Sequence, residues 1–220
     1  MTESTPRLRA DARRNREQII AAAREVFLEQ GIQASLEEIA RRAGVGIATL
    51  YRRFPDRETL VQQVALENMA LIGTELDRAT AEHPDAWGAL VQLLHRLVDL
   101  RVGVFMPVLA LSLEEDLRGE GGVLKARRNQ LFERMEQLVH TAQQEGQLRQ
   151  GITPIDIMLG AIKLSRPLPV IGAELNELLI DQQLELFLGG LHAVALDATE
   201  PLRRQPLTVD ELDRYLKMAE

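Results

Sequence analysis

The sequence predicts an all-α protein of about 9–10 helices, in which an N-terminal three-helix domain with a helix-turn-helix precedes a larger helical bundle. Residues that favour helices, chiefly Leu, Ala, Glu, Arg and Gln, dominate the chain, and aromatic residues make up only 4% of it. Apolar residues recur at helical spacing, and Gly, Pro and capping residues separate the apolar runs. The alternation of apolar and polar residues that marks strands is scarce.

Length and composition bound the classes of protein to which the chain can belong. Its 220 residues suffice for one large or two small domains with a sizeable core. The absence of cysteine excludes disulfides, thiol chemistry and Cys-ligated zinc. Residues 1–16 contain no apolar signal core, and the longest nearly apolar stretch, residues 102–111, is too short to span a membrane. We therefore expect a cytoplasmic protein with no membrane partner.

The first helix is expected over about residues 14–30, where Ile19, Val26 and Phe27 belong to one apolar stripe. Gly31 follows the last helical residue, where a left-handed conformation often ends a helix.

A helix-turn-helix follows in the sequence. A short helix is expected over residues 36–43, with Ser35 and Glu38 forming a capping box at its start. Gly44 supplies a sharp turn, and a third helix is expected over residues 47–53.

Further helices fill the rest of the chain. Pro55 ends the third helix, and Asp56 caps a long fourth helix over about residues 57–81. Thr153 and Pro154 are a start signal, a capping Thr followed by Pro at the first helical position. The apolar patterns predict helices over residues 85–102, a piece interrupted by Pro107 that ends near 117, and residues 122–145, 154–165, 174–195 and 209–218.

Charge is distributed unevenly along the chain. Residues 1–66 hold eleven Arg against nine acidic residues, whereas residues 67–220 hold 15 basic against 24 acidic residues. The net charge of −7 thus conceals a weakly basic first part, which is typical of a small nucleic-acid module attached to a larger acidic domain. We expect a domain with an N-terminal arm and the helix-turn-helix over residues 1–66, and a helical domain over residues 67–220.

The third helix has two faces that suit the major groove of DNA. At about 100° per residue, Leu50 and Phe54 share the face that packs on the preceding helix, and Ala48 points away from it. Small residues at the start of the helix allow close approach to base edges. We expect base contacts from Ile47, Ala48, Thr49 and Arg52, and phosphate contacts from Tyr51, Arg53 and Arg57.

Other DNA contacts are expected outside this face. Gly46 begins the third helix, and Ser35 and Leu36 at the start of the second present N–H groups to a phosphate. Arg13 and Arg14, placed just before or within the first turn of the first helix, reach the DNA backbone or the minor groove. The alternative is a three-helix bundle with surface arginines, or a protein-interaction module built on the same scaffold.

The helix-turn-helix resembles the N-terminal signature of the TetR family of bacterial repressors. The resemblance covers residues 14–66 densely and is carried by Ile39-Ala40-x-x-Ala43-Gly44-Val45-x-x-x-Thr49-Leu50-Tyr51-x-x-Phe54-Pro55-x-Arg57-x-x-Leu60. Beyond it, Gln144-Glu145-Gly146-x-Leu148-Arg149 followed by Thr153-Pro154-Ile155-Asp156 is similar to a pattern of the family's regulatory domain. Gly46 and Ile47 depart from the family's usual Ser and polar residue, so the resemblance does not carry over an operator sequence.

The resemblance implies that residues 67–220 bind a small ligand and form a homodimer. Wide apolar faces on the helices at 154–165 and 174–195 suit a four-helix interface, and ordinary intrachain core is the alternative. The expected interface comprises Ile155, Met158, Leu159, Ile162, Leu184, Phe187, Leu188 and Leu191.

A ligand pocket is expected inside the same domain, where Met and Phe suit an adaptable apolar cavity. For any one of these side chains, plain core is the alternative. The expected lining comprises Leu94, Leu97, Val98, Phe105, Met106, Leu109, Leu113, Met135, Leu138 and Val139. The four histidines show no metal-ligand spacing, and no cofactor motif is present.

The expected function is that of a repressor released from a pseudo-palindromic, double-stranded operator by a small, largely apolar effector. The alternative is a DNA-binding activator, or a regulator with no small-molecule ligand. An enzyme is not expected, because no phosphate loop, Ser-His-Asp set or paired-acid motif stands out.

Overall fold

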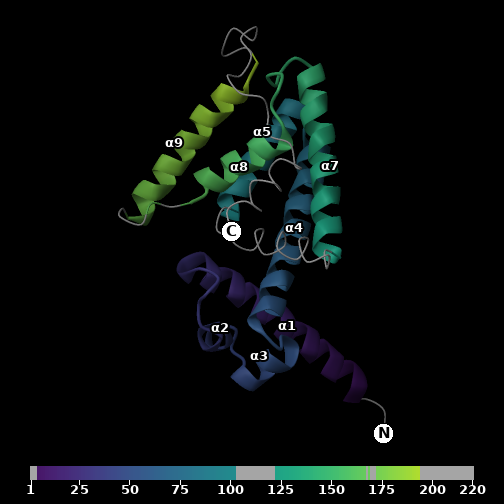
Figure 1. Cartoon of the computed structure of the whole chain (residues 1–220), viewed down its shortest axis with the longest axis vertical. Helices are drawn as coiled ribbons and strands as arrows, with labels where there is room; N and C mark the ends of the chain where they lie inside the picture. The colour runs from purple at the N-terminus through teal and green to yellow at the C-terminus, as the bar shows by residue number, and fades with distance from the viewer. Residues whose placement is uncertain (1–3, 103–121, 167, 169–171, 194–220) are drawn as a thin grey trace, which may run out of the picture. The chain divides into compact units, whose positions relative to one another are not determined.

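The structure of the chain is a computed structural model that describes residues 4–102, 122–166, 168 and 172–193. Its regular structure in these ranges consists of eight helices, so the prediction of an all-α fold is confirmed (Figure 1). The predicted helix containing Pro107 and the predicted helix over residues 209–218 lie outside the described residues.

Most helices have nearly the predicted bounds, because Gly, Pro and capping residues mark their ends in the sequence. The helices are α1 (Ser4–Gln30), α2 (Leu36–Arg42), α3 (Ile47–Arg53), α4 (Arg57–Glu82), α5 (Ala86–Asp99), α7 (Val123–Gln144), α8 (Pro154–Leu164) and α9 (Ala173–Leu191).

The start of α1 differs most from the prediction, because the helix begins at Ser4 rather than near residue 14. Its first ten residues include Pro6 in the first turn and several Arg and Ala residues, which suit a helix even where no apolar stripe is present. The apolar stripe starts only at Ile19, so the pattern did not reveal the start of α1.

The chain divides into two compact units, residues 1–67 (unit 1) and residues 68–220 (unit 2). Helix α4 contributes its first part to unit 1 and its remainder to unit 2. In unit 1, the apolar face of α1 packs on α2, and α2 packs on α3. Phe27, Ile39, Leu50 and Leu60 are fully buried in this core.

The core of unit 2 surrounds α5, which packs against α7, α8 and α9 (Figure 1). Leu90, Leu93, Leu94 and Leu97 of α5 are fully buried. An antiparallel bridge between Leu148 and His192 joins the segment after α7 to the end of α9.

Helices α8 and α9 approach each other closely at Gly160. A Cβ atom on this residue would lie only 2.2 Å from Cζ of Phe187. The missing side chain of Gly160 therefore makes room for the Phe187 ring.

Candidate nucleic-acid interface

A tight turn joins α2 to α3 and sets the direction of α3. Gly44 has a φ of 67°, in the left-handed region that favours glycine. The Val45 N–H donates to the Ala40 carbonyl over 3.0 Å. Ile39 of α2 and Leu50 of α3 are both 0% exposed where the two helices pack on each other. This packing holds the helices on either side of the turn in place.

Ser35 caps α2, but the predicted capping box is only half formed. The Ser35 hydroxyl oxygen accepts from the N–H groups of Glu37 and Glu38 over 3.2 and 3.4 Å. The Glu38 carboxylate turns instead to Arg41 and Arg42, which donate to it over 2.8 and 2.9 Å. The predicted capping box is therefore wrong in its second half, because two nearby guanidinium groups bind the Glu38 carboxylate more strongly than the N-cap N–H does.

The pair of arginines strongly stabilises the charged form of Glu38. Hydrogen bonds from Arg41 and then Arg42 lower the pKa of Glu38 to about 2. Arg42 also donates from Nη1 to Oε1 of Glu29 at the end of α1, over 2.7 Å. The Arg42 hydrogen bond lowers the pKa of Glu29 as well. Arg42 thus links α2 to α1, a role that its place in the sequence did not indicate.

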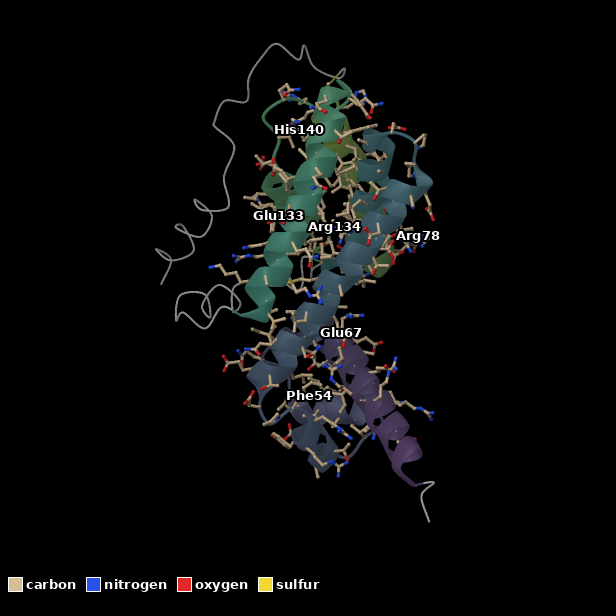
Figure 2. All side chains as sticks on the ribbon, turned by 90° about the vertical axis from the view of Figure 1, so that its right-hand side faces the viewer. Phe54, Glu67, Arg78, Glu133, Arg134 and His140 are labelled. Atoms are coloured by element: carbon tan, nitrogen blue, oxygen red, sulfur yellow. The ribbon has the colours of Figure 1, made fainter. Side chains whose placement is uncertain are left out.

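The outward face of α3 is arranged as the sequence predicts. Ala48 and Arg52 are exposed, and Leu50 on the opposite side is fully buried. Phe54 at the end of α3 is 2% exposed and lies within unit 1 (Figure 2). This face therefore presents a small residue near its start and a long cation near its end.

The residues beside this outward face differ in their exposure. Ile47 is 36% exposed and Tyr51 is 45% exposed, whereas Thr49 is half-buried. Gly46 is exposed and occupies the N-cap position of α3, with a φ of −69° and no side chain to accept a hydrogen bond.

Two of the predicted phosphate ligands are partly enclosed within unit 1. Nη1 of Arg57 donates to the main-chain carbonyls of Ile32 and Ala34, over 2.9 and 2.5 Å. Arg57 therefore holds the turn between α1 and α2. Arg53 is half-buried, and its Nε atom is buried without a hydrogen-bond partner.

Arg13 and Arg14 lie inside α1 rather than at its start. Both are exposed, and Nε of Arg13 donates to Glu17 one turn later over 2.8 Å. The expectation that they stand just before or within the first turn is wrong, because α1 begins at Ser4. Leu36, the first residue of α2, is buried, and only its main-chain N–H remains as a candidate contact.

The residues predicted to line a ligand pocket lie in unit 2. Those that the structure describes are Leu94, Leu97, Val98, Met135, Leu138 and Val139, and all of them are buried in the core. Phe105, Met106, Leu109 and Leu113 lie outside the described residues.

Most of the residues predicted to form the dimer interface are buried within the single chain. The side chains buried in this way are Ile155, Met158, Ile162, Leu184, Leu188 and Leu191. Leu159 and Phe187 are partly buried and pack against the core. The exposed apolar residues of α9 are instead Leu175, Leu178 and Leu186. At 100° per residue these occupy the face opposite Leu184 and Leu188.

None of the described helices has a stretch that is both long and apolar enough to cross a membrane. Within the described ranges, acidic and histidine side chains do not gather in threes as a metal site requires.

Two protein families match the chain. The family described as bacterial regulatory proteins of the tetR family matches residues 19–64. The family described as the C-terminal domain of SbtR-like transcriptional regulators matches residues 84–193.

Individual proteins are similar to parts of the chain. The nucleoid occlusion factor SlmA of Marinobacter nauticus is 31% identical over 144 residues, which are 63% of this chain and 71% of that protein. An HTH-type transcriptional regulator of Staphylococcus aureus is 27% identical over 96 residues, which are 43% of this chain and 52% of the relative.

Solved structures with the same fold span both units. A TetR transcriptional regulator from Streptomyces coelicolor has 30% identity and a TM-score of 0.57, covering 82% of this chain and 99% of its own. A TetR transcription regulatory protein from Mycobacterium vanbaalenii has 26% identity and a TM-score of 0.53, covering 84% of this chain and 99% of its own.

Proposed function

Because the chain belongs to the TetR family of bacterial transcriptional regulators and carries its DNA-binding helix-turn-helix, we propose that it is a repressor that binds a pseudo-palindromic operator as a homodimer. In a dimer, two recognition helices read half-sites about 34–36 Å apart, which is one turn of DNA. The observation that carries the proposal is the outward face of α3, where Ala48 and Arg52 are exposed opposite the buried Leu50.

The residues divide between base and phosphate contacts in the proposed complex. Base edges are read by Ile47, Ala48, Thr49 and Arg52, close to the small N-cap residue Gly46. Phosphates are bound by Tyr51, Arg53, Arg13, Arg14 and the N–H groups at Ser35 and Leu36. Arg57 contacts a phosphate through guanidinium nitrogens other than Nη1, because Nη1 already donates to two main-chain carbonyls.

A band shift tests whether the protein binds DNA from its own upstream region. The full-length chain is mixed at low salt with the intergenic DNA upstream of its gene and with an unrelated duplex of the same length. Retardation of the upstream DNA at protein concentrations that leave the unrelated duplex unbound supports the proposal. Failure to bind either duplex contradicts it.

For the homodimer, we propose the exposed face of α9 as the contact between subunits. Leu175, Leu178 and Leu186 are 48%, 64% and 65% exposed, and large exposed apolar groups that share a face mark interaction surfaces. Leu178→Glu and Leu186→Glu should produce monomers in sedimentation experiments. Val123→Glu, at a 65% exposed apolar position on α7, is the matched control and should stay dimeric. Dimers that persist in both α9 variants would contradict this assignment.

We further propose that a small, largely apolar ligand bound in unit 2 releases the operator. Helix α4 runs without interruption through residues 67 and 68, so a change in α4 within unit 2 acts on the helix that also belongs to unit 1. Such a ligand must bind the DNA-competent and DNA-incompetent states with different affinity. A screen for apolar compounds that both raise the melting temperature and dissociate the band-shift complex tests this step.

A second candidate is an activator, or a regulator that has no small-molecule ligand. The tight packing of Leu94, Leu97 and Met135, each 0% exposed, favours this candidate, because these residues were expected to line a pocket. Deletion of the gene distinguishes the sign of regulation. Transcription from the adjacent promoter rises when a repressor is lost and falls when an activator is lost.

A further inference from the structure

The start of α3 presents an apolar surface. The residues from Gly44 to Ala48 carry no polar side-chain atom, and Gly46, Ile47 and Ala48 are all exposed. Because Gly46 has no side chain, the N-cap position lacks the hydroxyl or carboxylate oxygen that Ser or Asp would place there. The side chains exposed at the start of α3, Ile47 and Ala48, are therefore both apolar.

Large exposed apolar side chains in unit 1 are confined to this helix. Among residues 11–67, whose side chains the structure describes, they are Ile47 and Tyr51, which are 36% and 45% exposed. The two residues are one turn apart and so lie on the same side of α3. Covering such groups removes apolar surface from water, which favours a partner molecule that fits over them.

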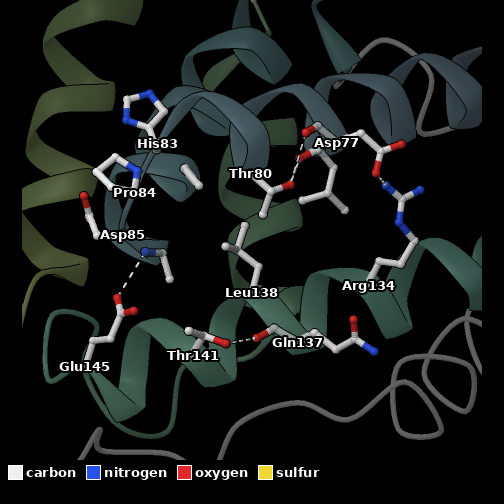
Figure 3. A pocket seen from close by; sticks show the side chains of 13 residues that line it. Asp77, Thr80, His83, Pro84, Asp85, Arg134, Gln137, Leu138, Thr141 and Glu145 are labelled. Atoms are coloured by element: carbon white, nitrogen blue, oxygen red, sulfur yellow. Dashed lines mark hydrogen bonds and ion pairs between the residues drawn. The ribbon is translucent and has the colours of Figure 1, made fainter.

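The pocket of unit 2 between α4, α5 and α7 has the opposite character (Figure 3). Most of its lining residues are polar, and the Arg134 guanidinium in it pairs with the Asp77 carboxylate (Figure 3). Its apolar residue Leu138 is only 6% exposed. Large exposed apolar side chains are thus found on α3 and not in this pocket.

The major groove of DNA offers one apolar group on its base edges, the C5-methyl group of thymine. The other groups that the bases present there are hydrogen-bond donors and acceptors. The side chains of Ile47 and Ala48 have neither a donor nor an acceptor, so they cannot replace the water that binds these polar groups. A thymine methyl group is therefore the base feature that matches the start of α3.

Arg52 can read a different base pair from the one at the start of α3. It is exposed and lies one turn beyond Ala48, which is about 6 Å along the helix axis. Successive base pairs are about 3.4 Å apart. Arginine donates two hydrogen bonds to guanine in the major groove, so its contact is chemically distinct from a methyl contact. The two contacts can thus be removed independently.

We propose that Ile47 and Ala48 bind the C5-methyl group of a thymine in each half-site, so that the start of α3 selects thymine at one base pair of the operator. The inference rests on the proposed function, because it requires α3 to lie in the major groove. Any other base at this position leaves the two apolar side chains against polar groups and is disfavoured there.

Fluorescence anisotropy of the full-length protein with two versions of the upstream intergenic duplex tests the inference. One duplex contains thymine, and the other contains uracil at every thymine position. Uracil keeps the hydrogen-bonding groups of thymine and lacks only the methyl group. The wild type should bind the uracil duplex more weakly, by about threefold to fivefold for each half-site, as expected for one buried methyl group.

Two negative results have different meanings. Equal affinity of the wild type for both duplexes would overturn the methyl contact and leave the proposed function standing. Failure to bind either duplex at low salt would overturn the proposed function and the methyl contact together.

Three variants test whether Ile47 makes the methyl contact. Ile47→Ala should bind the two duplexes with nearly equal affinity, because the side chain that covers the methyl group is shortened. Arg52→Ala should bind both duplexes more weakly and keep the wild-type ratio of their affinities. Val123→Ala is the matched control, since it shortens a 65% exposed apolar side chain of unit 2 and should keep both the affinity and the ratio. A wild-type ratio in Ile47→Ala would overturn the assignment.

Discussion

Arg42 on α2 donates a hydrogen bond of 2.7 Å from Nη1 to Oε1 of Glu29, at the C-terminal end of α1. The same guanidinium binds Glu38 one turn earlier on α2. Arg42 therefore connects two helices of unit 1, whereas its neighbour Arg41 binds Glu38 alone among the described ion pairs. The orientation of the helix-turn-helix depends in part on this one side chain.

Arg42→Met should lower the urea midpoint of unfolding and weaken DNA binding, because it frees α2 from α1 and leaves Glu29 and Glu38 without their shared cation. Arg41→Met is the matched control, since it loses a contact within α2 only. Equilibrium unfolding monitored by circular dichroism compares the two variants. An equal loss in both would show that the link to α1 contributes nothing specific.

Glu38 should make unit 1 sensitive to acid. Its pKa is lowered from the usual 4.5 to about 2, so the folded chain holds this proton more weakly than the unfolded chain does. The stability that Glu38 contributes is therefore fully present above its unfolded pKa and is lost as the pH falls through its folded pKa. Urea unfolding of wild type and Glu38→Gln should differ more at neutral pH than near pH 3 (about the middle of this range). The same difference at both pH values would be inconsistent with the Arg41 and Arg42 contacts.

Gly46→Ser should stabilise unit 1 by about 0.5–1 kcal/mol, from a new N-cap hydrogen bond and a smaller unfolded-state entropy. The backbone of Gly46 has a φ of −69°, and an added Cβ would meet nothing within 4 Å. Gly44→Ser is the control, because Gly44 has a φ of 67° and should lose stability on substitution. Melting temperatures give the signs, and a loss at residue 46 would exclude the cap.

Gly160→Ala should destabilise unit 2 by about 1–3 kcal/mol, because its methyl group overlaps the Phe187 ring. Adding Phe187→Leu should recover part of the loss, and the double-mutant cycle measures this coupling. Gly189→Ala is the control on α9, where an added Cβ has no neighbour within 4 Å. Additive effects of the first two changes would mean that α8 and α9 are not in close contact at this point.

The bounds of α3 and the buried positions of Leu50 and Phe54 were predictable, because local signals specify them. Gly44 and Pro55 bracket the helix, and helical spacing separates its buried face from its exposed face. The contacts of Arg57 with Ile32 and Ala34 were not predictable, since main-chain carbonyls more than 20 residues away leave no sequence signature.

The burial of the predicted dimer residues within the chain was not predictable for a different reason. Helix α9 carries apolar residues on two opposite faces, one with Leu184 and Leu188 and one with Leu178 and Leu186. Periodicity identifies both faces, but it does not tell which one packs inside the chain. The same ambiguity applies to the residues predicted to line a pocket. The spacing of Leu94 and Leu97 fits plain core as well as it fits a pocket wall.

The central claim is that the outward face of α3 binds operator DNA through Arg52. Fluorescence anisotropy of a labelled duplex from the upstream intergenic region measures this most directly, with wild type, Arg52→Ala and Arg78→Ala titrated at several salt concentrations. Arg78 is an exposed arginine of α4 in unit 2 that pairs with Glu82, so its removal is the control (Figure 2). We expect wild type and Arg78→Ala to bind alike and Arg52→Ala to bind about tenfold more weakly or worse, since an arginine base contact is worth ~1–3 kcal/mol. Wild-type affinity in Arg52→Ala, or no binding by the wild type at low salt, would contradict the claim.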